Sequence, residues 1–318
     1  MRLDQYPSVS AIRTASSTAP GGESRRPNAI PAAELRAWAT PQPPIVALPR
    51  GEAALSAASR AATVSAIAGP RVPPDARTLA LLAQDVYADS AAPPAGWRVA
   101  RSADLDRLGI DPAVLENRET GFRARVYVEG TGAQTRYVVS FRGSVTRGDW
   151  IANGQQAIGL PTDHYRRALL IGQRLARASG VDVTLTGHSL GGGLASAAGL
   201  ASGRPAATFN AAGLSDATIG AANAIRGATG AAGPEISAYY VRGDILSALQ
   251  DGGDRVAGAL LGAWLGGASG ALTGARLVDA PEAYGTRIAL DAVRPEGTHW
   301  WNDTPIARHG MDWVLASL

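Results

Sequence analysis

The feature that most constrains the fold is a glycine-flanked serine, Gly187-His188-Ser189-Leu190-Gly191. The run before it, 181–186 (VDVTLT), is rich in β-branched residues and predicts a strand, and the small-residue run from Leu190 onward predicts a helix. A strand and a helix meet in so tight a turn only where glycine removes Cβ atoms from their closest approach. The pattern therefore predicts a strand–turn–helix unit that exposes the Ser189 hydroxyl above the edge of a sheet.

Strand and helix signals alternate on both sides of this turn. β-rich or alternating runs predict strands at 121–128, 136–141, 206–210 and 236–241. Apolar residues at helical spacing predict helices at 78–89 and 165–179. The alternation predicts an α/β fold with a mostly parallel central sheet and helices on both faces.

Composition divides the chain near residue 75. Residues 1–75 are rich in Ser, Ala, Pro and Arg, and we expect either a disordered linker or a segment for delivery or chaperone binding. Residues 76–318 are expected to form the folded domain. The first twenty residues have no apolar stretch like that of a Sec signal peptide, so export by that route is not expected.

Cysteine usage and charge exclude several classes of function. The chain has no Cys, which excludes disulfides, thiolate catalysis and cysteine-ligated metals. Its 30 basic residues, all Arg, against 27 acidic ones give a net charge of +3. The arginines are scattered rather than grouped in blocks, so nucleic acid is not an expected partner. No cofactor and no metal ion are expected either.

A serine hydroxyl is a weak nucleophile unless a general base, itself oriented by an acid, takes its proton. Asp244 follows the strand predicted at 236–241, at the strand end where such groups gather, and is the expected acid. Asp251 and Asp254 are the alternatives. Ser189, the expected nucleophile, precedes all three in the chain.

Of the four histidines, only His299 and His309 follow Asp244. His309, just before a short C-terminal helix, is the expected base, and His299 is the alternative. His188 is expected to pack or to hydrogen-bond locally. His164, ahead of the helix at 165–179, is expected to be a loop residue.

The negative oxygen of a tetrahedral intermediate needs two hydrogen-bond donors. Leu190 begins the helix after the serine, and Ser144 follows the strand at 136–141, so their backbone N–H groups are the expected oxyanion hole. The next segment, 149–153 (DWIAN), either braces this loop or packs around its tryptophan.

Three motifs, FRGS at 141–144, DWIAN at 149–153 and GHSLGG at 187–192, resemble those of class 3, fungal-type lipases in the same order. The resemblance covers roughly 78–318. From 121 to 214 the chain also resembles bacterial lipase-domain effectors and toxins.

The resemblance implies an α/β-hydrolase fold and hydrolysis of acyl esters in lipids. By resemblance, Ser189 is the nucleophile, and Ser144 and Leu190 are the oxyanion donors. The resemblance assigns the acid to Asp244 and the base to His309 less directly. Asn153 stands where fungal members often have Asp, which puts a bracing carboxylate there in doubt. The tail 1–75 and the segment after Asp244 have no counterpart in the compact fungal enzymes.

Residues 256–275 carry no charge, and glycine recurs at every fourth position from Gly258 to Gly274. On a helix this spacing places the glycines on one face, as in close helix pairs. Three interpretations stay open: a lid or membrane-docking element, a packed helix or helical hairpin, and a membrane span.

Two functions of different classes follow. The first is a serine acyl-ester hydrolase of phospholipase A or lysophospholipase type, a bacterial effector made without a Sec signal and exported by a specialised secretion system to act at a target-cell membrane. Its expected partners are a lipid substrate and a secretion chaperone or an inhibitor or immunity protein. The second is a membrane-active or binding protein on a hydrolase scaffold, acting through 256–275.

Overall fold

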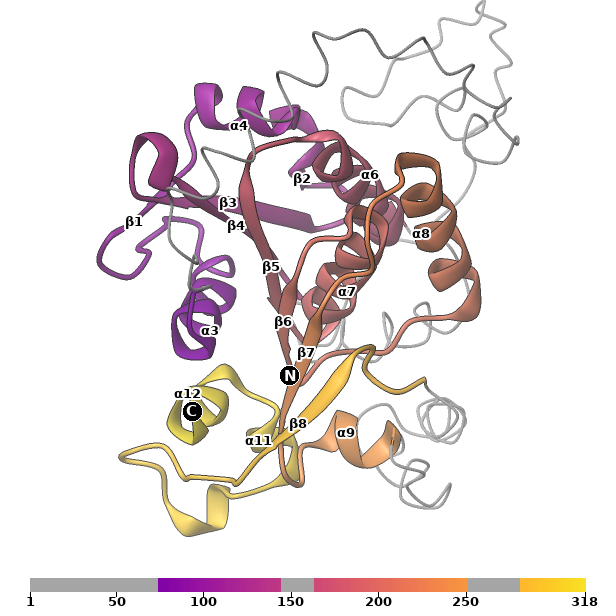
Figure 1. Ribbon diagram of the computed structural model, residues 1–318. Coiled ribbons are helices and arrows are strands. Elements are labelled where there is room, and N and C mark those ends of the chain that lie inside the picture. Colours follow the sequence, from indigo (N-terminus) through magenta and orange to yellow (C-terminus); the bar gives the residue numbers. More distant parts are fainter. Residues whose placement is uncertain (1–73, 144–162, 251–280) are drawn as a thin grey trace, which may run out of the picture. The chain divides into compact units, whose positions relative to one another are not determined.

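The computed structural model describes residues 74–143, 163–250 and 281–318 (Figure 1). These residues all belong to one compact unit that spans residues 46–318. The remaining segments, 1–73, 144–162 and 251–280, lie outside the described residues. With them lie several sequence predictions: the tail 1–75 almost entirely, Ser144, the loop 149–153, Asp251, Asp254 and the glycine-spaced segment 256–275.

The centre of the described residues is an eight-stranded mixed sheet with the main strand order β1-β3-β4-β5-β6-β7-β8, and β2 pairs with β3. Strands β4 to β8 run parallel to one another, whereas β1, β2 and β4 each pair antiparallel with β3. The predicted mostly parallel sheet is therefore confirmed. The strands are β1 Trp97–Val99, β2 Glu116–Asn117, β3 Phe122–Glu129, β4 Arg136–Phe141, β5 Asp182–His188, β6 Ala206–Phe209, β7 Ile236–Val241 and β8 Thr286–Leu290.

Helices cover both faces of the sheet (Figure 1), as the sequence predicts. On one face α7 lies against β4, β5 and β6, and α6 and α8 pack on α7. On the other face α3 lies against β4, β5 and β6, and α12 packs on α3 and β7. The helices are α3 Ala76–Asp85, α4 Ser102–Leu108, α6 Asp163–Arg177, α7 Leu190–Ser202, α8 Asp216–Thr229, α9 Ile245–Gln250, α11 Pro305–Arg308 and α12 Met311–Ser317, with short 3₁₀ turns at Pro112–Val114, Gly132–Gln134 and Trp300–Asn302.

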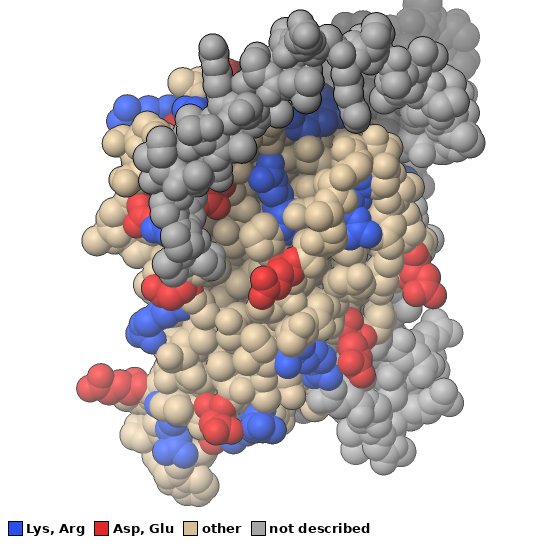
Figure 2. Space-filling view, in the orientation of Figure 1, with Lys and Arg blue, Asp and Glu red and all other residues tan. Residues whose placement is uncertain are grey.

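None of the described helices combines the length and the apolar composition that crossing a bilayer requires. On the face drawn in Figure 2, the described basic and acidic side chains are interspersed among larger areas of uncharged residues.

Helix α3 shows how side chains set the ends of an element. It starts two residues earlier than predicted because the carboxylate of Asp75 accepts the Thr78 N–H at 2.7 Å as an N-cap. It ends at Asp85 rather than near residue 89. There Arg125 on β3 donates to the Asp85 carbonyl at 2.9 Å, and the Tyr127 hydroxyl donates to the Asp85 carboxylate at 2.5 Å. These bonds hold the C-terminal end of α3 against the sheet.

The sequence does not predict the two edge strands of the sheet, β1 and β8. Each is short and only partly buried, so neither carries the apolar alternation that predicts a strand. Conversely, the strand predicted at 206–210 ends one residue earlier, because Asn210 turns into the left-handed region with φ 43°.

Candidate active site

Ser189 occupies the turn between β5 and α7, as the strand–turn–helix pattern predicts. Its backbone has φ 58° and ψ −127°, a strained conformation for a residue with a side chain. The flanking glycines make this turn possible. A Cβ on Gly191 would overlap the Phe141 carbonyl oxygen, and one on Gly187 would overlap the backbone of Gly191. The strain is thus held by close packing of strand β4, strand β5 and helix α7.

The structure brings Ser189, His309 and Asp244 together from three separate segments. The Ser189 Oγ lies 3.0 Å from His309 Nε2, and His309 Nδ1 lies 2.6 Å from Asp244 Oδ1. A carboxylate accepts, so Nδ1–H donates to Asp244 and Nε2 is left to accept the Ser189 proton. This arrangement can deprotonate the serine as it attacks.

Asp244 is fully buried in the turn between β7 and α9, where it caps the helix. Its Oδ2 accepts the backbone N–H and the hydroxyl of Ser247, both at 2.9 Å. Burial by itself would raise the pKa of Asp244. The neighbouring His309 and the two bonds from Ser247 outweigh burial and hold the pKa below its ordinary value. The carboxylate therefore stays ionised beside the imidazole.

Asn210 fixes the backbone on which His309 sits. Its side-chain amide donates to the carbonyls of Arg308 and His309, both at 3.1 Å, and its Oδ1 accepts the Val241 N–H at 2.9 Å. One side chain at the end of β6 thus ties the end of β7 to the loop between α11 and α12. Asp244 and His309 are carried on those two segments.

His188 is buried and hydrogen-bonds across the molecule, not to its neighbours in sequence as expected. Its Nε2 lies 2.7 Å from the His309 carbonyl, which can only accept, so Nε2–H is the donor. Its Nδ1 then accepts the Tyr87 hydroxyl at 3.0 Å. Burial, helped by the nearby His309, lowers the pKa of His188 to about 3. The ring is therefore a neutral, single tautomer.

Tyr87 extends this chain of bonds to the strand that precedes Ser144. Its oxygen accepts the Gly143 N–H at 3.1 Å. A Cβ on Gly143 would lie 3.4 Å from the Cβ of Ser189, so β4 ends directly beside the serine. Because the Gly143 N–H donates to Tyr87, it is not an available donor for an oxyanion.

Of the two expected oxyanion donors, Leu190 is the first residue of α7, where a backbone N–H has no partner within the helix. Ser144 lies outside the described residues, one position after Gly143. The other histidines lie elsewhere. The His299 ring stacks on Trp301 with centroids 4.3 Å apart, and His164 is in the first turn of α6 rather than in a loop, with its ring against Phe122.

Sequence reasoning missed three residues of this site: Tyr87, Asn210 and Ser247. Of these, only Ser247 could have been predicted from the sequence. A serine three residues after an N-capping aspartate places its N–H and hydroxyl at the carboxylate. Within the described parts of the chain, no three His, Asp or Glu side chains gather closely enough to bind a metal ion.

A sheet with parallel central strands, helices on both faces and a serine on the strand–helix turn defines an α/β-hydrolase fold. Comparison with known families narrows this class. The model of a phospholipase-like family, the Tle-like phospholipase domain, matches residues 78–296. The match covers more than half of the chain, so this chain belongs to the Tle-like phospholipase domain family. It includes Ser189 and Asp244 and ends before His309.

A curated relative agrees with this family. The chain is 36% identical over 160 residues to a protein of Serratia liquefaciens named extracellular phospholipase A1. The matched segment is 50% of this chain and 49% of that protein, so this chain spans about half of the relative's length. The resemblance to bacterial lipases and phospholipases is thus confirmed, and the finer assignment to class 3 lipases stays a prediction.

Proposed function

We propose that this protein is a serine hydrolase that cleaves acyl esters of phospholipids, with phospholipase A or lysophospholipase activity. One observation carries the proposal. The hydroxyl of Ser189, on a strained turn, lies 3.0 Å from an imidazole whose other nitrogen lies 2.6 Å from a buried carboxylate. Membership of a phospholipase family and the name of the Serratia relative support phospholipid as the substrate class.

The proposed reaction is that of a serine hydrolase. Ser189 Oγ attacks the ester carbonyl carbon while its proton passes to His309 Nε2, and Asp244 stabilises the imidazolium. The tetrahedral oxyanion accepts hydrogen bonds from the N–H groups of Leu190 and Ser144. As the ester C–O bond breaks, His309 returns the proton to the leaving alkoxide, which leaves an acyl-serine. Water, deprotonated by His309, then releases the fatty acid and restores Ser189.

The C-terminal segment offers a contact for a lipid surface. Trp300 and Trp301, just ahead of α11 and His309, are 70% and 59% exposed. Indole rings, apolar with one polar N–H, suit the boundary between water and acyl chains.

The place of action is a finer part of the proposal. The Tle-like family and the word "extracellular" in the name of the relative support action outside the producing cell. We propose an effector that leaves through a specialised secretion system and acts at a target-cell membrane. A secretion chaperone on residues 1–75, or an immunity protein that blocks the site, is the partner this role requires.

The test is release of acyl chains from mixed phospholipid vesicles, analysed by mass spectrometry. Wild type and Ser102→Ala, a control at an exposed serine that begins α4, should release fatty acid and lysolipid. Ser189→Ala should be at least about 10³-fold slower, because the nucleophile is gone. Equal release by Ser189→Ala contradicts the proposed nucleophile. If none of the three cleaves either lipid or p-nitrophenyl butyrate, the enzymatic function is wrong and membrane activity through 256–275 becomes the better hypothesis.

A further inference from the structure

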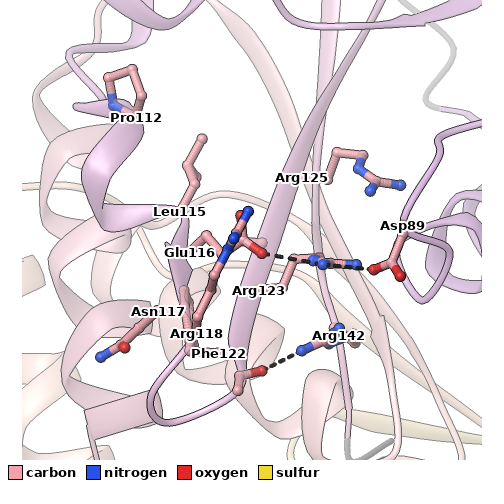
Figure 3. A pocket seen from close by; sticks show the side chains of 12 residues that line it. Asp89, Pro112, Leu115, Glu116, Asn117, Arg118, Phe122, Arg123, Arg125 and Arg142 are labelled. Atoms are coloured by element: carbon pink, nitrogen blue, oxygen red, sulfur yellow. Dashed lines mark hydrogen bonds and ion pairs between the residues drawn. The ribbon is translucent and has the colours of Figure 1, made fainter. Parts of the chain in front are cut away.

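A cavity of about 620 Å³ lies beside the end of strand β4 (Figure 3). Its walls come from the loop and strand around β2, from the start of β3, from Asp89 after α3 and from Arg142 directly after β4. Figure 3 shows Arg123 in the middle, between Glu116 and Asp89, with Arg142 next to it.

The charges in this cavity are unbalanced. Of the described residues that line it, four are arginines and two are carboxylates. Both carboxylates bind the same guanidinium: Arg123 Nη2 lies 2.9 Å from Asp89 and 3.1 Å from Glu116. Arg125 is satisfied outside the cavity, 3.1 Å from Asp85. The positive charges of the other two arginines, Arg118 and Arg142, are therefore left without an ion pair to any described residue.

Arg142 is the more constrained of these two. It is half-buried, and among the described residues it makes a single side-chain hydrogen bond, from Nη2 to the Gly121 carbonyl at 2.6 Å. Its buried Nε has no hydrogen-bond partner in the parts of the chain that the structure describes. Burial, and then the positive charge of Arg123, lower the pKa of Arg142, although the carboxylates of Glu116 and Asp89 oppose this. Holding two cations together in a partly desolvated place costs free energy that a bound anion would recover.

The cavity adjoins the candidate active site. Arg142 is bonded covalently to Gly143, whose N–H binds Tyr87. A Cβ on Gly191, two residues after the serine, would come within 2.9 Å of the Arg142 carbonyl carbon. The Arg142 guanidinium also acts on the Tyr87 hydroxyl: burial raises the pKa of Tyr87, and this positive charge opposes the rise. An anion at Arg142 would thus bind on the residue that joins this cavity to the strand end beside Ser189.

We propose that this cavity is a phosphate-binding site formed by Arg142 and Arg118, with Arg123 as a third, already paired cation. A guanidinium presents a planar fork of donors that matches phosphate oxygens. Building on the proposed function, the phosphate is the head-group phosphate of the lipid, which one glycerol carries together with the cleaved ester. A free phosphate ion has the same chemistry and is the other source to be distinguished.

The first experiment compares two lipids that differ only in the phosphate, dioleoyl phosphatidic acid and dioleoylglycerol, in the same detergent micelles. The quantity measured is the ratio of kcat/KM for the two lipids, which cancels any general loss of activity. In Arg142→Gln and Arg118→Gln this ratio should fall about tenfold, the effect of losing one charge-assisted hydrogen bond. Arg142→Lys should recover part of it, and Arg107→Gln, an exposed arginine of α4, should keep the wild-type ratio.

The second experiment measures the rise in unfolding midpoint that inorganic phosphate causes in each variant. A rise in wild type and Arg107→Gln that is lost in Arg142→Gln supports the site. If phosphate binding depends on Arg142 but the lipid ratio does not, the ligand is free phosphate. If wild type cleaves neither lipid while this rise still depends on Arg142, the site stands and the proposed function fails. If neither the ratio nor the rise depends on Arg142 or Arg118, the phosphate site is overturned.

Discussion

Two neighbouring regions of this molecule differ in whether their polar groups have hydrogen-bond partners within the protein. Around Ser189, a network that we call the inner network (Tyr87, Gly143, His188, Asn210 and His309) pairs its donors and acceptors within the protein. In the cavity beside β4, the Arg142 guanidinium has a buried Nε without a hydrogen-bond partner among the described residues, and it forms no ion pair with any of them. The inner network keeps its side chains in place without a ligand, whereas we propose that the Arg142 guanidinium gains its partner when an anion binds. The difference indicates that paired polar groups position the candidate catalytic residues, and that an unpaired one is suited to bind a substrate.

The largest effect should come from breaking the inner network at its acid. Asp244→Asn keeps the size of the side chain but no longer requires Nδ1–H on His309, so Nε2 can carry the proton and stop accepting from Ser189. We expect kcat to fall about 10⁴-fold. The measurement is hydrolysis of p-nitrophenyl butyrate, with Asp216→Asn, at an exposed position of α8, as control. A loss below tenfold would show that another residue orients the base.

A second, smaller effect should come from Tyr87→Phe, which leaves His188 Nδ1 without its donor and the Gly143 N–H without its acceptor. Unpaired buried groups cost about 1–3 kcal/mol each, so the free energy of unfolding should fall by a few kcal/mol. The end of β4, which leads into Ser144, also loses its anchor. We therefore expect kcat to fall about tenfold with little change in KM.

The matched control is Tyr240→Phe on β7, because the Tyr240 ring packs under the Arg287 guanidinium. Active serines are counted with a fluorophosphonate that labels Ser189, and kcat is expressed per labelled site. If Tyr87→Phe loses only stability and keeps its kcat per labelled site, Tyr87 is a structural residue and not a positioning residue.

How much of this the sequence predicts depends on whether the requirement is local. The turn around Ser189 is predictable because Gly187 and Gly191, the residues that must lack a Cβ there, stand within two positions of the serine in the sequence. The mostly parallel sheet follows from alternation of apolar strands and amphipathic helices. Strand β8 does not, because its side chains are partly exposed and the strand is specified by pairing with β7.

The same distinction applies to the site. Chain order and strand ends lead to Asp244 and His309, which the structure places within hydrogen-bonding distance of each other, although their catalytic roles stay predictions. Tyr87 and Asn210 could not be found in this way. Their partners are distant in sequence, and nothing near either residue indicates which backbone groups it will meet.

The smallest predicted effect is a pH dependence of the free energy of unfolding that is caused by His188. It tests the inner network by itself, because His188 belongs to that network. The folded pKa of about 3 lies below the ordinary value of 6.5, so between these values the unfolded chain binds the extra proton. The free energy of unfolding that comes from keeping this ring neutral is fully present above about pH 6.5. It is lost as the pH falls toward 3, by up to about 1.4 kcal/mol per pH unit.

Urea unfolding of wild type and His188→Gln at pH 7, 5.5 and 4.5 measures this loss. His164 and Asp244, whose pKa values are also lowered, contribute to both proteins, so the difference in slope belongs to His188. His188→Gln lowers stability at every pH through lost hydrogen bonds, but its slope should be shallower. Parallel curves would mean that His188 takes up a proton in the folded protein, and the tautomer that binds both Tyr87 and His309 would then be wrong.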